Sequence, residues 1–490
     1  MAPLALGARR AVVAALLLHL SLCRSLARRP PSPPSAPPRT PAAARQQQQP
    51  QQPASGGALN ASLVLLSNNP LGAKCLDGSP PGYYFRPGFG AGKRFWHIFL
   101  PAGGWCATLA DCALRATHPL GSTRYWARLN GSAPSSTSAP PAPSPPSTSP
   151  SRPLPLFPAP SSPTSSFDDS DDSQSASPLR AVPGFSGMLS GSEAVNPGLF
   201  NWNLAMPIYC DGGGYAGTAG RVQLPGKGNN SIYLDGYNVT RAILADLLAV
   251  RGMASARRVL VAGASAGGQA VTAWCERVAG MVPGAATKCL MDSGIFLDAR
   301  DRAGVLYFRQ VARQMTALHR AHGNDKCMQV ESPSTKWRCF FPQYTLPHIT
   351  APLFLLSPLL DHRALMLGNQ VRNDSGYAKR CLSNILRSTA NLTHTMRYST
   401  RRNAMAGKVK MCTPEETKAV LVAGNTLLAS VTAIVQDQAT WVAYIPASAA
   451  HCYTYFPSYS EISIKQYSLK NAVADWALDV RTKLRLNGPS

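Results

Sequence analysis

The feature that most constrains this chain is the pentapeptide Gly263-Ala264-Ser265-Ala266-Gly267. A short apolar run typical of a buried strand, residues 259–262, precedes it, and a helical pattern follows from residue 266 to about residue 278. A serine in this context lies on a tight turn from a strand into a helix, and the two glycines keep side chains from crowding the bend. The pentapeptide alone also fits a small-residue turn without chemistry, but its flanking patterns favour an exposed nucleophile.

Strand-like and helix-like segments alternate along most of the chain. Residues 96–100, 352–356 and 441–445 have the apolar pattern of strands, and residues 417–435 have the pattern of a helix. Alternation of this kind favours an α/β fold with a central, mostly parallel sheet flanked by helices.

A serine hydroxyl needs a base that is oriented by a carboxylate before it can act as a nucleophile. On this type of sheet the acid and then the histidine follow the serine in the chain. Asp361 comes soon after the strand expected at 352–356, and His451 follows the strand expected at 441–445 through a loop of small residues. We therefore expect Ser265, Asp361 and His451 to form a catalytic triad.

Four other residues compete for these roles. Asp292 follows another expected strand end; we expect it to brace the site and to border the substrate pocket. His394 lies in a polar loop, which favours a solvated surface histidine, and His362 directly follows the proposed acid and is expected to point away from the serine. His97 lies within an expected strand, where a histidine with only a structural role is more common.

Backbone N–H groups are needed to stabilise the negative charge that develops on a substrate carbonyl oxygen. One is expected from Ala266, the residue after the nucleophile. Others are expected from the loop at Gly103 and Gly104, which follows the strand expected at 96–100. Trp105 would then form a wall of the substrate pocket, whereas the alternative is a simple Gly-Gly turn.

The first 27 residues have the features of an export signal: Arg9 and Arg10, an apolar run too short to cross a bilayer, and a small-residue cleavage site. An uncleaved signal anchor is the alternative. No later transmembrane segment is expected. Six Asn-X-Ser/Thr sequons fit a secretory route and are glycosylation candidates: Asn60, Asn130, Asn229, Asn238, Asn373 and Asn391.

Two low-complexity segments lack the apolar periodicity that a folded core requires. Residues 28–57 form a linker rich in Pro and Gln, and residues 132–180 are rich in Ser and Pro. The second segment interrupts ordinary globular sequence on both sides, so we expect a disordered insertion within one domain, residues 58–490.

The chain has 12 cysteines and a formal net charge of +24. The cysteines are too numerous for an ordinary cytosolic enzyme, and no pair of Cys-X2-Cys motifs has zinc-ligand spacing, so an oxidising compartment is the simpler interpretation. The positive charge would attract any polyanion and does not identify a partner.

Several motifs occur together in the order seen in one family, and on these the chain resembles the pectin acetylesterase and Notum group of serine carboxylesterases. They include Cys75-Leu-Asp-Gly, Gly103-Gly-Trp-Cys106, Tyr209-Cys-Asp-Gly212, Gly263-Ala-Ser-Ala-Gly-Gly268, Asp292-Ser-Gly, Cys339-Phe-Phe-Pro-Gln343 and His451-Cys452. The resemblance implies an α/β-hydrolase fold, no metal or other cofactor, and catalysis by Ser265, Asp361 and His451. The family usually has Glu-Gly before the Gly-Gly-Trp loop, whereas this chain has Pro101 and Ala102.

The family pattern, together with short spacings, suggests five disulfides. Loss of the export signal would remove Cys23 and leave 11 cysteines, an odd number. The family often has a cysteine three residues before the histidine, and Ser448 stands there in this chain, so we expect Cys452 to be free. The suggested pairs are Cys75 with Cys210, Cys106 with Cys112, Cys275 with Cys289, Cys327 with Cys339, and Cys381 with Cys412.

The function expected from these features is a secreted, monomeric serine esterase that removes acetyl groups from an acidic cell-wall polysaccharide or another extracellular ester. Nucleic acid is not an expected partner. A Notum-like enzyme that removes a longer acyl chain from a lipidated protein is one alternative. A catalytically inactive protein that binds glycans or polyanions is another.

Overall fold

The structure is a computed structural model that describes residues 61–129, 185–226, 230–390, 412–436, 438, 440–480 and 485–487. The expected signal peptide (1–27), linker (28–57) and insertion (132–180) lie outside the described residues. So do four sequons, those at Asn60, Asn130, Asn229 and Asn391. Asn373 is exposed, and Asn238 is partly buried in a helix, where its amide donates a hydrogen bond to Asp235.

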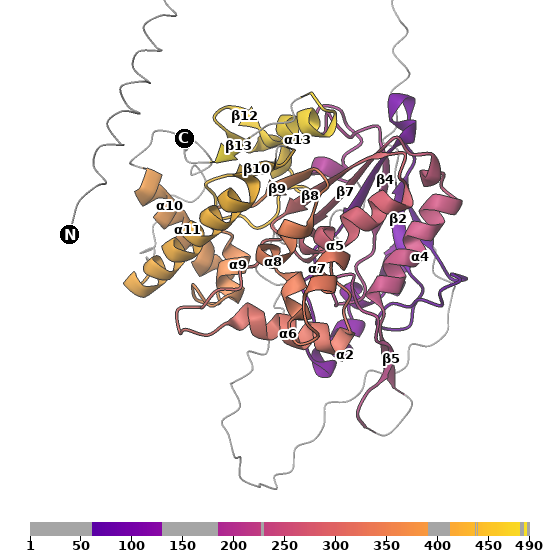
Figure 1. The fold of residues 1–490 in the computed structure, drawn as a ribbon, viewed down its shortest axis with the longest axis horizontal. Helices are drawn as coiled ribbons and strands as arrows, with labels where there is room; N and C mark the ends of the chain where they lie inside the picture. Colours follow the sequence, from indigo (N-terminus) through magenta and orange to yellow (C-terminus); the bar gives the residue numbers. More distant parts are fainter. Residues whose placement is uncertain are drawn as a thin grey trace, which may run out of the picture. The chain divides into compact units, whose positions relative to one another are not determined.

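The fold is built on a nine-stranded mixed sheet in the order β1-β2-β4-β3-β7-β8-β9-β10-β13 (Figure 1). β2 runs antiparallel to both of its neighbours, and the strands from β4 to β13 pair in parallel. The strands are β1 (Ser62–Leu65), β2 (Gly82–Arg86), β3 (Phe95–Leu100), β4 (Asn203–Pro207), β7 (Arg258–Ala264), β8 (Ala286–Asp292), β9 (Leu353–Leu356), β10 (Val442–Ile445) and β13 (Arg485–Asn487). The expected α/β architecture is confirmed.

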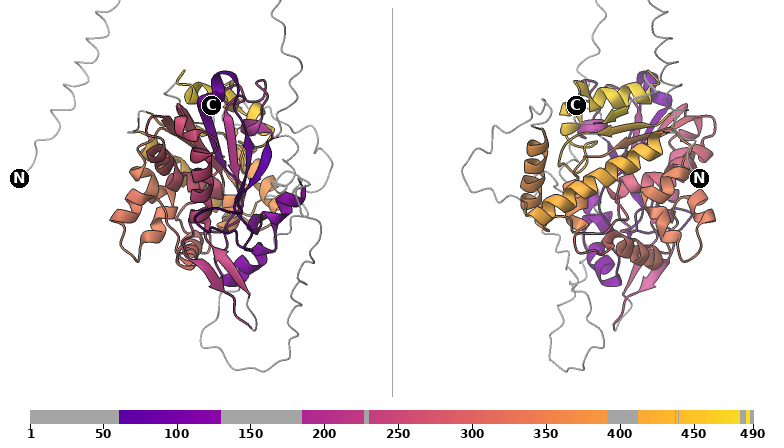
Figure 2. Two further views of the ribbon diagram at one scale, coloured as in Figure 1. Left: turned by 90° about the vertical axis from the view of Figure 1, so that its right-hand side faces the viewer. Right: turned by 60° about the vertical axis from the view of Figure 1, so that its left-hand side comes forward.

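Helices flank this sheet, as the three views in Figures 1 and 2 show. They are α2 (Leu109–Ala116), α3 (Arg124–Leu129), α4 (Gly236–Ala249), α5 (Ala266–Met281), α6 (Tyr307–His319), α7 (Asp325–Val330), α8 (Pro342–Thr345), α9 (His362–Leu367), α10 (Ser375–Ala390), α11 (Pro414–Gln436), α12 (Ser458–Glu461) and α13 (Leu469–Ala477). Two small antiparallel ribbons complete the described fold: β5 (Gly220–Gln223) with β6 (Ser231–Leu234), and β11 (Ser463–Ile464) with β12 (Tyr467–Ser468).

The central strands are largely buried because helices cover both faces of the sheet. In β7, every residue after Arg258 is buried, and β9 and β10 are buried throughout. Continuous apolar runs of this kind are typical of parallel strands between two helical layers. Helices α4, α5, α11 and α13 contribute side chains to the same core.

Helix α11 differs from the expectation that no later segment could cross a membrane. By length and composition alone, Pro414–Val435 could cross a membrane. Of its most apolar stretch, 28% is buried inside the protein. Leu427, Val431 and Val435 lie on one stripe of the helix and pack into the main core. The sequence did not indicate a possible span here because Gly424, Asn425 and several Ala and Thr residues separate the strongly apolar positions of this segment.

Five disulfides join the same cysteine pairs that the family resemblance implied. They are Cys75–Cys210, Cys106–Cys112, Cys275–Cys289, Cys327–Cys339 and Cys381–Cys412. Cys452 is free and buried. This number of disulfides fits a protein that folds in an oxidising compartment.

Candidate active site

Ser265 lies on a strained turn between the end of β7 and the start of α5. Its backbone adopts φ 53° and ψ −119°, a combination that non-glycine residues rarely occupy. Two backbone hydrogen bonds hold the turn: Ser265 N donates to Asp292 O at 2.8 Å, and Gln269 N donates to Ser265 O at 2.9 Å. This geometry is the strand-to-helix turn expected for the pentapeptide.

The two glycines of the pentapeptide are required by close backbone contacts. A Cβ atom on Gly263 would lie 2.3 Å from the carbonyl oxygen of Gly267, across the turn. A Cβ atom on Gly267 would lie 2.0 Å from the carbonyl oxygen of Leu100, at the end of β3. The second contact places the loop after β3 directly against the turn that carries Ser265.

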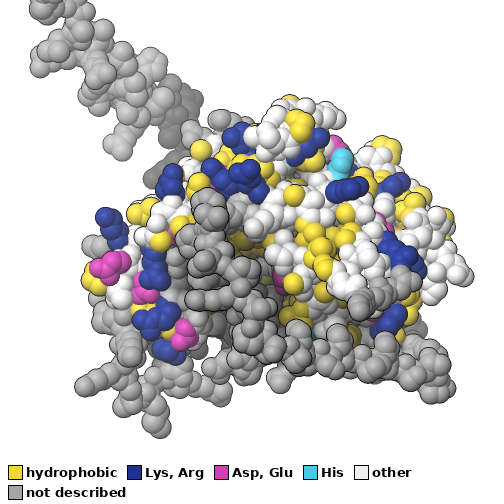
Figure 3. Space-filling model, turned by 90° about the horizontal axis from the view of Figure 1, so that it is seen from below, with side chains coloured by type: hydrophobic (Ala, Val, Ile, Leu, Met, Phe, Trp, Pro, Cys, Tyr) yellow, Lys and Arg dark blue, Asp and Glu magenta, His cyan; other side chains and the backbone are white. Residues whose placement is uncertain are grey.

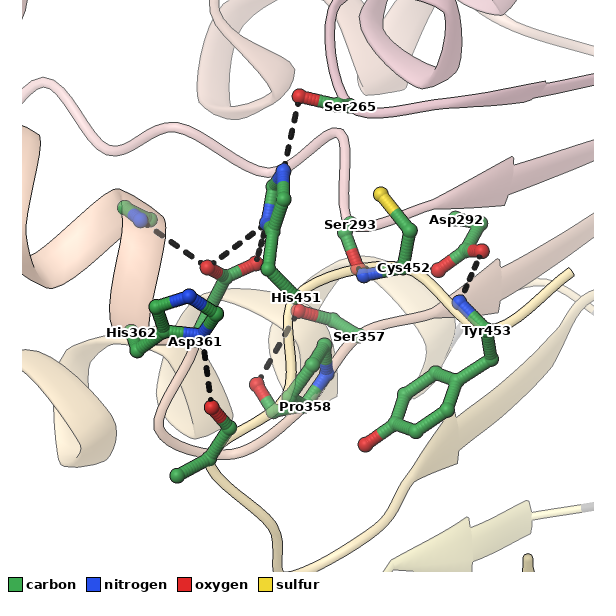
Figure 4. Close-up of polar contacts among 12 residues, drawn as sticks. Ser265, Asp292, Ser293, Ser357, Pro358, Asp361, His362, His451, Cys452 and Tyr453 are labelled. Carbon is green, nitrogen blue, oxygen red and sulfur yellow. Dashed lines mark hydrogen bonds and ion pairs between the residues drawn. The ribbon is translucent and has the colours of Figure 1, made fainter. Parts of the chain in front are cut away.

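Ser265, His451 and Asp361 form a continuous hydrogen-bonded line (Figure 4). His451 Nε2 lies 3.0 Å from Ser265 Oγ, and His451 Nδ1 lies 2.9 and 2.8 Å from the two carboxylate oxygens of Asp361. The imidazole can therefore accept the serine proton at Nε2 while its Nδ1–H donates to the carboxylate. The structure brings together the three residues chosen from the sequence.

The loops that carry Asp361 and His451 are hydrogen-bonded to each other. Leu359 N donates to Pro446 O at 2.9 Å, and Leu360 N donates to Ser448 O at 3.1 Å. Asp361 also caps α9 by accepting a hydrogen bond from Ala364 N at 3.0 Å. These contacts fix the position of the Asp361 carboxylate beside the imidazole of His451.

Burial and charge act in opposite directions on the two partners. Burial raises the pKa of Asp361, but the nearby His451 and its hydrogen bond outweigh burial, so the pKa lies below its usual value. Burial lowers the pKa of His451, but the Asp361 carboxylate outweighs burial and raises the pKa well above 6.5. The pair therefore favours a carboxylate beside an imidazolium, the charge state that forms when histidine takes the serine proton.

Asp292 is fully buried behind this line. One carboxylate oxygen accepts hydrogen bonds from Tyr453 N at 2.7 Å and from Thr454 N and Oγ1, each at 2.8 Å. The other accepts from Ser293 Oγ at 2.9 Å. The structure places Asp292 as an anchor for the chain just after His451.

The other histidines considered for the triad were His394, His97 and His362. His394 lies outside the described residues. His97 is buried within β3, where its ring packs edge-on against Phe99. The Nδ1–H of His362 donates to Ala449 O at 2.9 Å, so His362 holds the loop before His451 and does not face Ser265.

The loop at Gly103 and Gly104 lies against the Ser265 turn, and three side chains hold its carbonyl groups. Tyr215 Oη donates to Pro101 O at 2.7 Å, Arg115 Nη1 to Gly103 O at 2.8 Å, and Tyr209 Oη to Gly104 O at 2.5 Å. Gly104 has φ 60°, which glycine tolerates best. No sequence pattern predicted a role for Arg115, Tyr209 or Tyr215, although Tyr209 begins one of the motifs that carried the resemblance.

Trp105 stands beside an aromatic cluster next to the triad. Its ring centroid lies 4.8 Å from that of Phe296 in an edge-to-face contact, and Phe296 lies 5.4 Å from Phe308. A small cavity of about 60 Å³ borders this cluster and is lined by Asp361, Phe308 and apolar neighbours. Ligand pockets for larger molecules usually measure about 300–1,000 Å³.

Within the described residues, the one cluster with metal-ligating groups is Cys106, Cys112 and His319. The two cysteines form a disulfide, so neither offers a thiolate to a metal ion. His319 Nε2 lies 3.0 Å from Cys106 O, where its N–H can donate. These residues therefore brace the loop after Trp105, and their chemistry does not fit a metal site.

Comparison with known proteins gives one consistent family. The sequence profile of the pectinacetylesterase family matches residues 55–143 and 166–487. Over 294 residues the chain is 31% identical to pectin acetylesterase 7 of Arabidopsis thaliana, a match that covers 59% of each chain. Over 320 residues it is 30% identical to pectin acetylesterase 5 of the same plant, with 64% of this chain and 61% of the relative covered.

More distant relatives include animal enzymes. The chain is 24% identical over 320 residues to the palmitoleoyl-protein carboxylesterase NOTUM of Homo sapiens, with 60% of this chain and 50% of that protein covered. The match thus spans about three fifths of the two plant relatives and half of the human one.

Proposed function

The chain belongs to the pectinacetylesterase family, and from this premise we propose that it is a secreted serine carboxylesterase that removes acetyl groups from a polysaccharide. The observation that carries the proposal is the hydrogen-bonded line from Ser265 Oγ through His451 to Asp361. This is the arrangement that activates a serine hydroxyl toward an ester carbonyl.

The proposed reaction has two stages, acylation and then deacylation of Ser265. His451 Nε2 accepts the Ser265 proton while the serine oxygen attacks the ester carbonyl, and N–H groups of Gly104 and Ala266 stabilise the oxyanion. His451 then gives its proton to the leaving alcohol, and acetyl-Ser265 forms. Water, deprotonated by His451, attacks the acetyl-enzyme and releases acetate, and the proton returns to Ser265.

The aromatic packing around Trp105 leaves little room for a long acyl chain. Phe296 packs edge-on against Trp105. The nearby cavity that Phe308 and Asp361 line measures about 60 Å³, well below the usual size of a pocket for a larger ligand. An acetyl group needs only a small recess. The filled aromatic cluster therefore favours acetyl esters over the longer acyl group named for the NOTUM relative.

The charge of the chain is compatible with an acidic polysaccharide. Its formal net charge is +24, and Lys and Arg side chains are spread over several parts of the face shown in Figure 3. A polyuronate would be attracted to such a surface. The expected export signal and the five disulfides support secretion.

The proposal is tested by the hydrolysis of p-nitrophenyl esters with acyl chains of two and eight carbons. The parent enzyme is expected to hydrolyse acetate with the higher kcat/KM and to release acetate from acetylated pectin. Ser265→Ala should lower kcat at least about 10³-fold. An inactive parent would favour the glycan-binding alternative, and a parent that prefers octanoate would favour the long-chain deacylase.

Phe296→Ala tests the acyl-size argument separately. Removing this ring should open space beside Trp105 and raise the octanoate-to-acetate ratio of kcat/KM by about tenfold. Phe85→Ala is the matched control, because Phe85 is also buried and stacks on a tryptophan, Trp96, but lies in β2. An unchanged ratio in Phe296→Ala would contradict a filled acyl site.

A further inference from the structure

The loop that bears the proposed oxyanion donors is held by its carbonyl groups. Three of these carbonyls each accept a hydrogen bond from a buried side chain: Pro101 from Tyr215, Gly103 from Arg115, and Gly104 from Tyr209. Arg115 is 5% exposed and comes from α2, which the Cys106–Cys112 disulfide ties to the end of the loop.

The chemistry of the peptide bond links these carbonyls to the oxyanion donors. The carbonyl of Gly103 and the N–H of Gly104 belong to one planar trans unit, in which C=O and N–H point in opposite directions. A cation that pulls electron density toward the Gly103 oxygen makes the Gly104 N–H a stronger donor, because the two groups share the same resonance. The guanidinium of Arg115 occupies that position, 2.8 Å from the oxygen.

A chain of hydrogen bonds ends at the next peptide unit, which joins Gly104 and Trp105. Gly214 N donates to Tyr209 Oη at 3.1 Å, and Tyr209 Oη donates in turn to Gly104 O at 2.5 Å. Burial raises the pKa of Tyr209, so its hydroxyl keeps the proton it donates. Successive hydrogen bonds polarise one another, and the end of this chain is the Trp105 N–H.

The direction of the donors follows from the packing. Because Gly267 abuts the carbonyl oxygens of Leu100 and Pro101, the loop lies directly against the start of α5. Arg115 and Tyr209 hold the Gly103 and Gly104 carbonyls toward themselves, which turns the Gly104 and Trp105 N–H groups the other way. The Ala266 N–H, at the first residue of α5, would complete the set.

We propose that Arg115 and Tyr209 are positioning residues that polarise the oxyanion loop through the Gly103–Gly104 and Gly104–Trp105 peptide bonds. Neither side chain touches the substrate. The inference rests on the proposed esterase activity and adds two residues to it. Because the developing charge exists only in the transition state, the effect belongs in kcat and not in KM.

The test compares Arg115→Met, Arg115→Lys and Tyr209→Phe with the parent on p-nitrophenyl acetate. Removal of one whole oxyanion donor costs about 10²–10³ in kcat, and loss of its polarisation should cost less, about 10- to 100-fold for Arg115→Met, with KM changed less than about threefold. Arg115→Lys keeps the charge and should recover part of the loss. Tyr209→Phe should lower kcat about 3- to 30-fold.

Inhibitor affinities separate polarisation from general damage. When an aryl trifluoromethyl ketone binds, the Ser265 oxygen adds to its carbonyl carbon and the serine proton moves to His451. The ketone oxygen becomes an alkoxide in the oxyanion position. Its Ki should rise in Arg115→Met by a factor similar to the loss in kcat. The Ki of acetanilide, a trigonal and uncharged analogue, should stay within about threefold of the parent value, because that ligand develops no negative charge.

Arg86→Met is the matched control. Arg86 is 3% exposed, and its Nη1 donates to a backbone carbonyl, Leu189 O, at 2.7 Å, but it lies in β2. Folded Arg86→Met should keep the parent's kcat and ketone affinity. If Arg115→Met does not fold, Tyr209→Phe and Arg115→Lys decide by the same readouts.

Three results would overturn the proposal: kcat within twofold of the parent in the folded variants, a loss of kcat without loss of ketone affinity, or an equal loss in Arg86→Met. Failure of the esterase assignment would look different. In that case the parent itself would not hydrolyse acetate, or Ser265→Ala would hydrolyse it equally well.

Discussion

His451 is the residue whose protonation state controls the proposed reaction. It must be neutral to accept the serine proton, and its pKa is raised well above 6.5 by the Asp361 carboxylate despite burial. The same contact, at 2.8 Å, stabilises the imidazolium once it forms. The carboxylate thus strengthens the base and also moves its working range to higher pH.

The pH dependence of kcat/KM should follow this shift. Below its pKa, His451 holds a proton and cannot act as a base, so kcat/KM should rise about tenfold per pH unit and level off only above pH 6.5. A pH–rate profile on p-nitrophenyl acetate measures the midpoint, and the same profile for Asp361→Asn serves as the control, with a lower plateau. A parent midpoint below 6.5 would contradict the assigned electrostatics.

Asp292 acts on the site through the chain that follows His451. Replacing it with Ala would remove the acceptor of the buried backbone N–H groups of Tyr453 and Thr454. We expect Asp292→Ala to lower the free energy of unfolding by at least about 2 kcal/mol and to reduce kcat, since unpaired buried donors are costly. Thermal or urea denaturation together with steady-state kinetics measures both effects.

Glu193→Ala is the control for that substitution. Glu193 is an exposed carboxylate, so its loss should change the free energy of unfolding by less than about 1 kcal/mol. Equal stability losses in the two variants would argue against Asp292 as the anchor of the histidine segment.

At the scale of elements, the junction of β7 and α5 fits against the end of β3. Gly267 is the contact point, because its missing side chain lets the Leu100 carbonyl approach the helix. The proposed nucleophile and the proposed oxyanion loop therefore both depend on one glycine. Gly280, near the other end of the same helix, has open space where a Cβ would lie.

Gly267→Ala and Gly280→Ala form a matched pair within α5. Gly267→Ala should displace the oxyanion loop and reduce kcat/KM at least about 100-fold, since small misplacements of catalytic groups have large effects. Gly280→Ala should keep full activity and raise the stability by about 0.5–1 kcal/mol, the usual gain from Gly to Ala inside a helix. Activity assays and denaturation curves on both variants check this, and an active Gly267→Ala would refute the packing argument.

The central elements were predictable from sequence because strong local patterns specify them. The strand expected at 259–262 is β7 (Arg258–Ala264), and the helix expected at 266–278 is α5 (Ala266–Met281). The ends of β7 were missed because pairing with β3 and β8 fixes them. The end of α5 was missed because its last buried residue is Val278, so the final turn to Met281 carries no apolar pattern. Arg115 and Tyr209 carry no local signal, since their role depends on a loop that reaches them only in the folded chain.

At the scale of the whole molecule, ten cysteines are paired and one described cysteine is free. Cys452 is 2% exposed beside the triad, and burial raises the pKa of its thiol. Both effects make it unreactive in the folded protein. The remaining cysteine, Cys23, lies in the expected export signal.

Thiol labelling of the native and the denatured protein should therefore test the disulfide arrangement. In protein that lacks the expected export signal, iodoacetamide should label no cysteine under native conditions and one cysteine, Cys452, in denaturant without reductant. Peptide mapping by mass spectrometry identifies the site. Labelling of any of the ten paired cysteines, or Cys452 in an intrachain disulfide, would contradict the disulfide arrangement.

Trapping the acyl-enzyme tests the assignment of Ser265 as the nucleophile. The parent should be mixed with p-nitrophenyl acetate, quenched in acid and digested, and the peptides measured by mass spectrometry. We predict an added acetyl group on the peptide that contains Ser265, absent from Ser265→Ala and strongly reduced in His451→Ala. Acetylation of a different residue during turnover, or undiminished turnover in Ser265→Ala, would contradict Ser265 as the nucleophile.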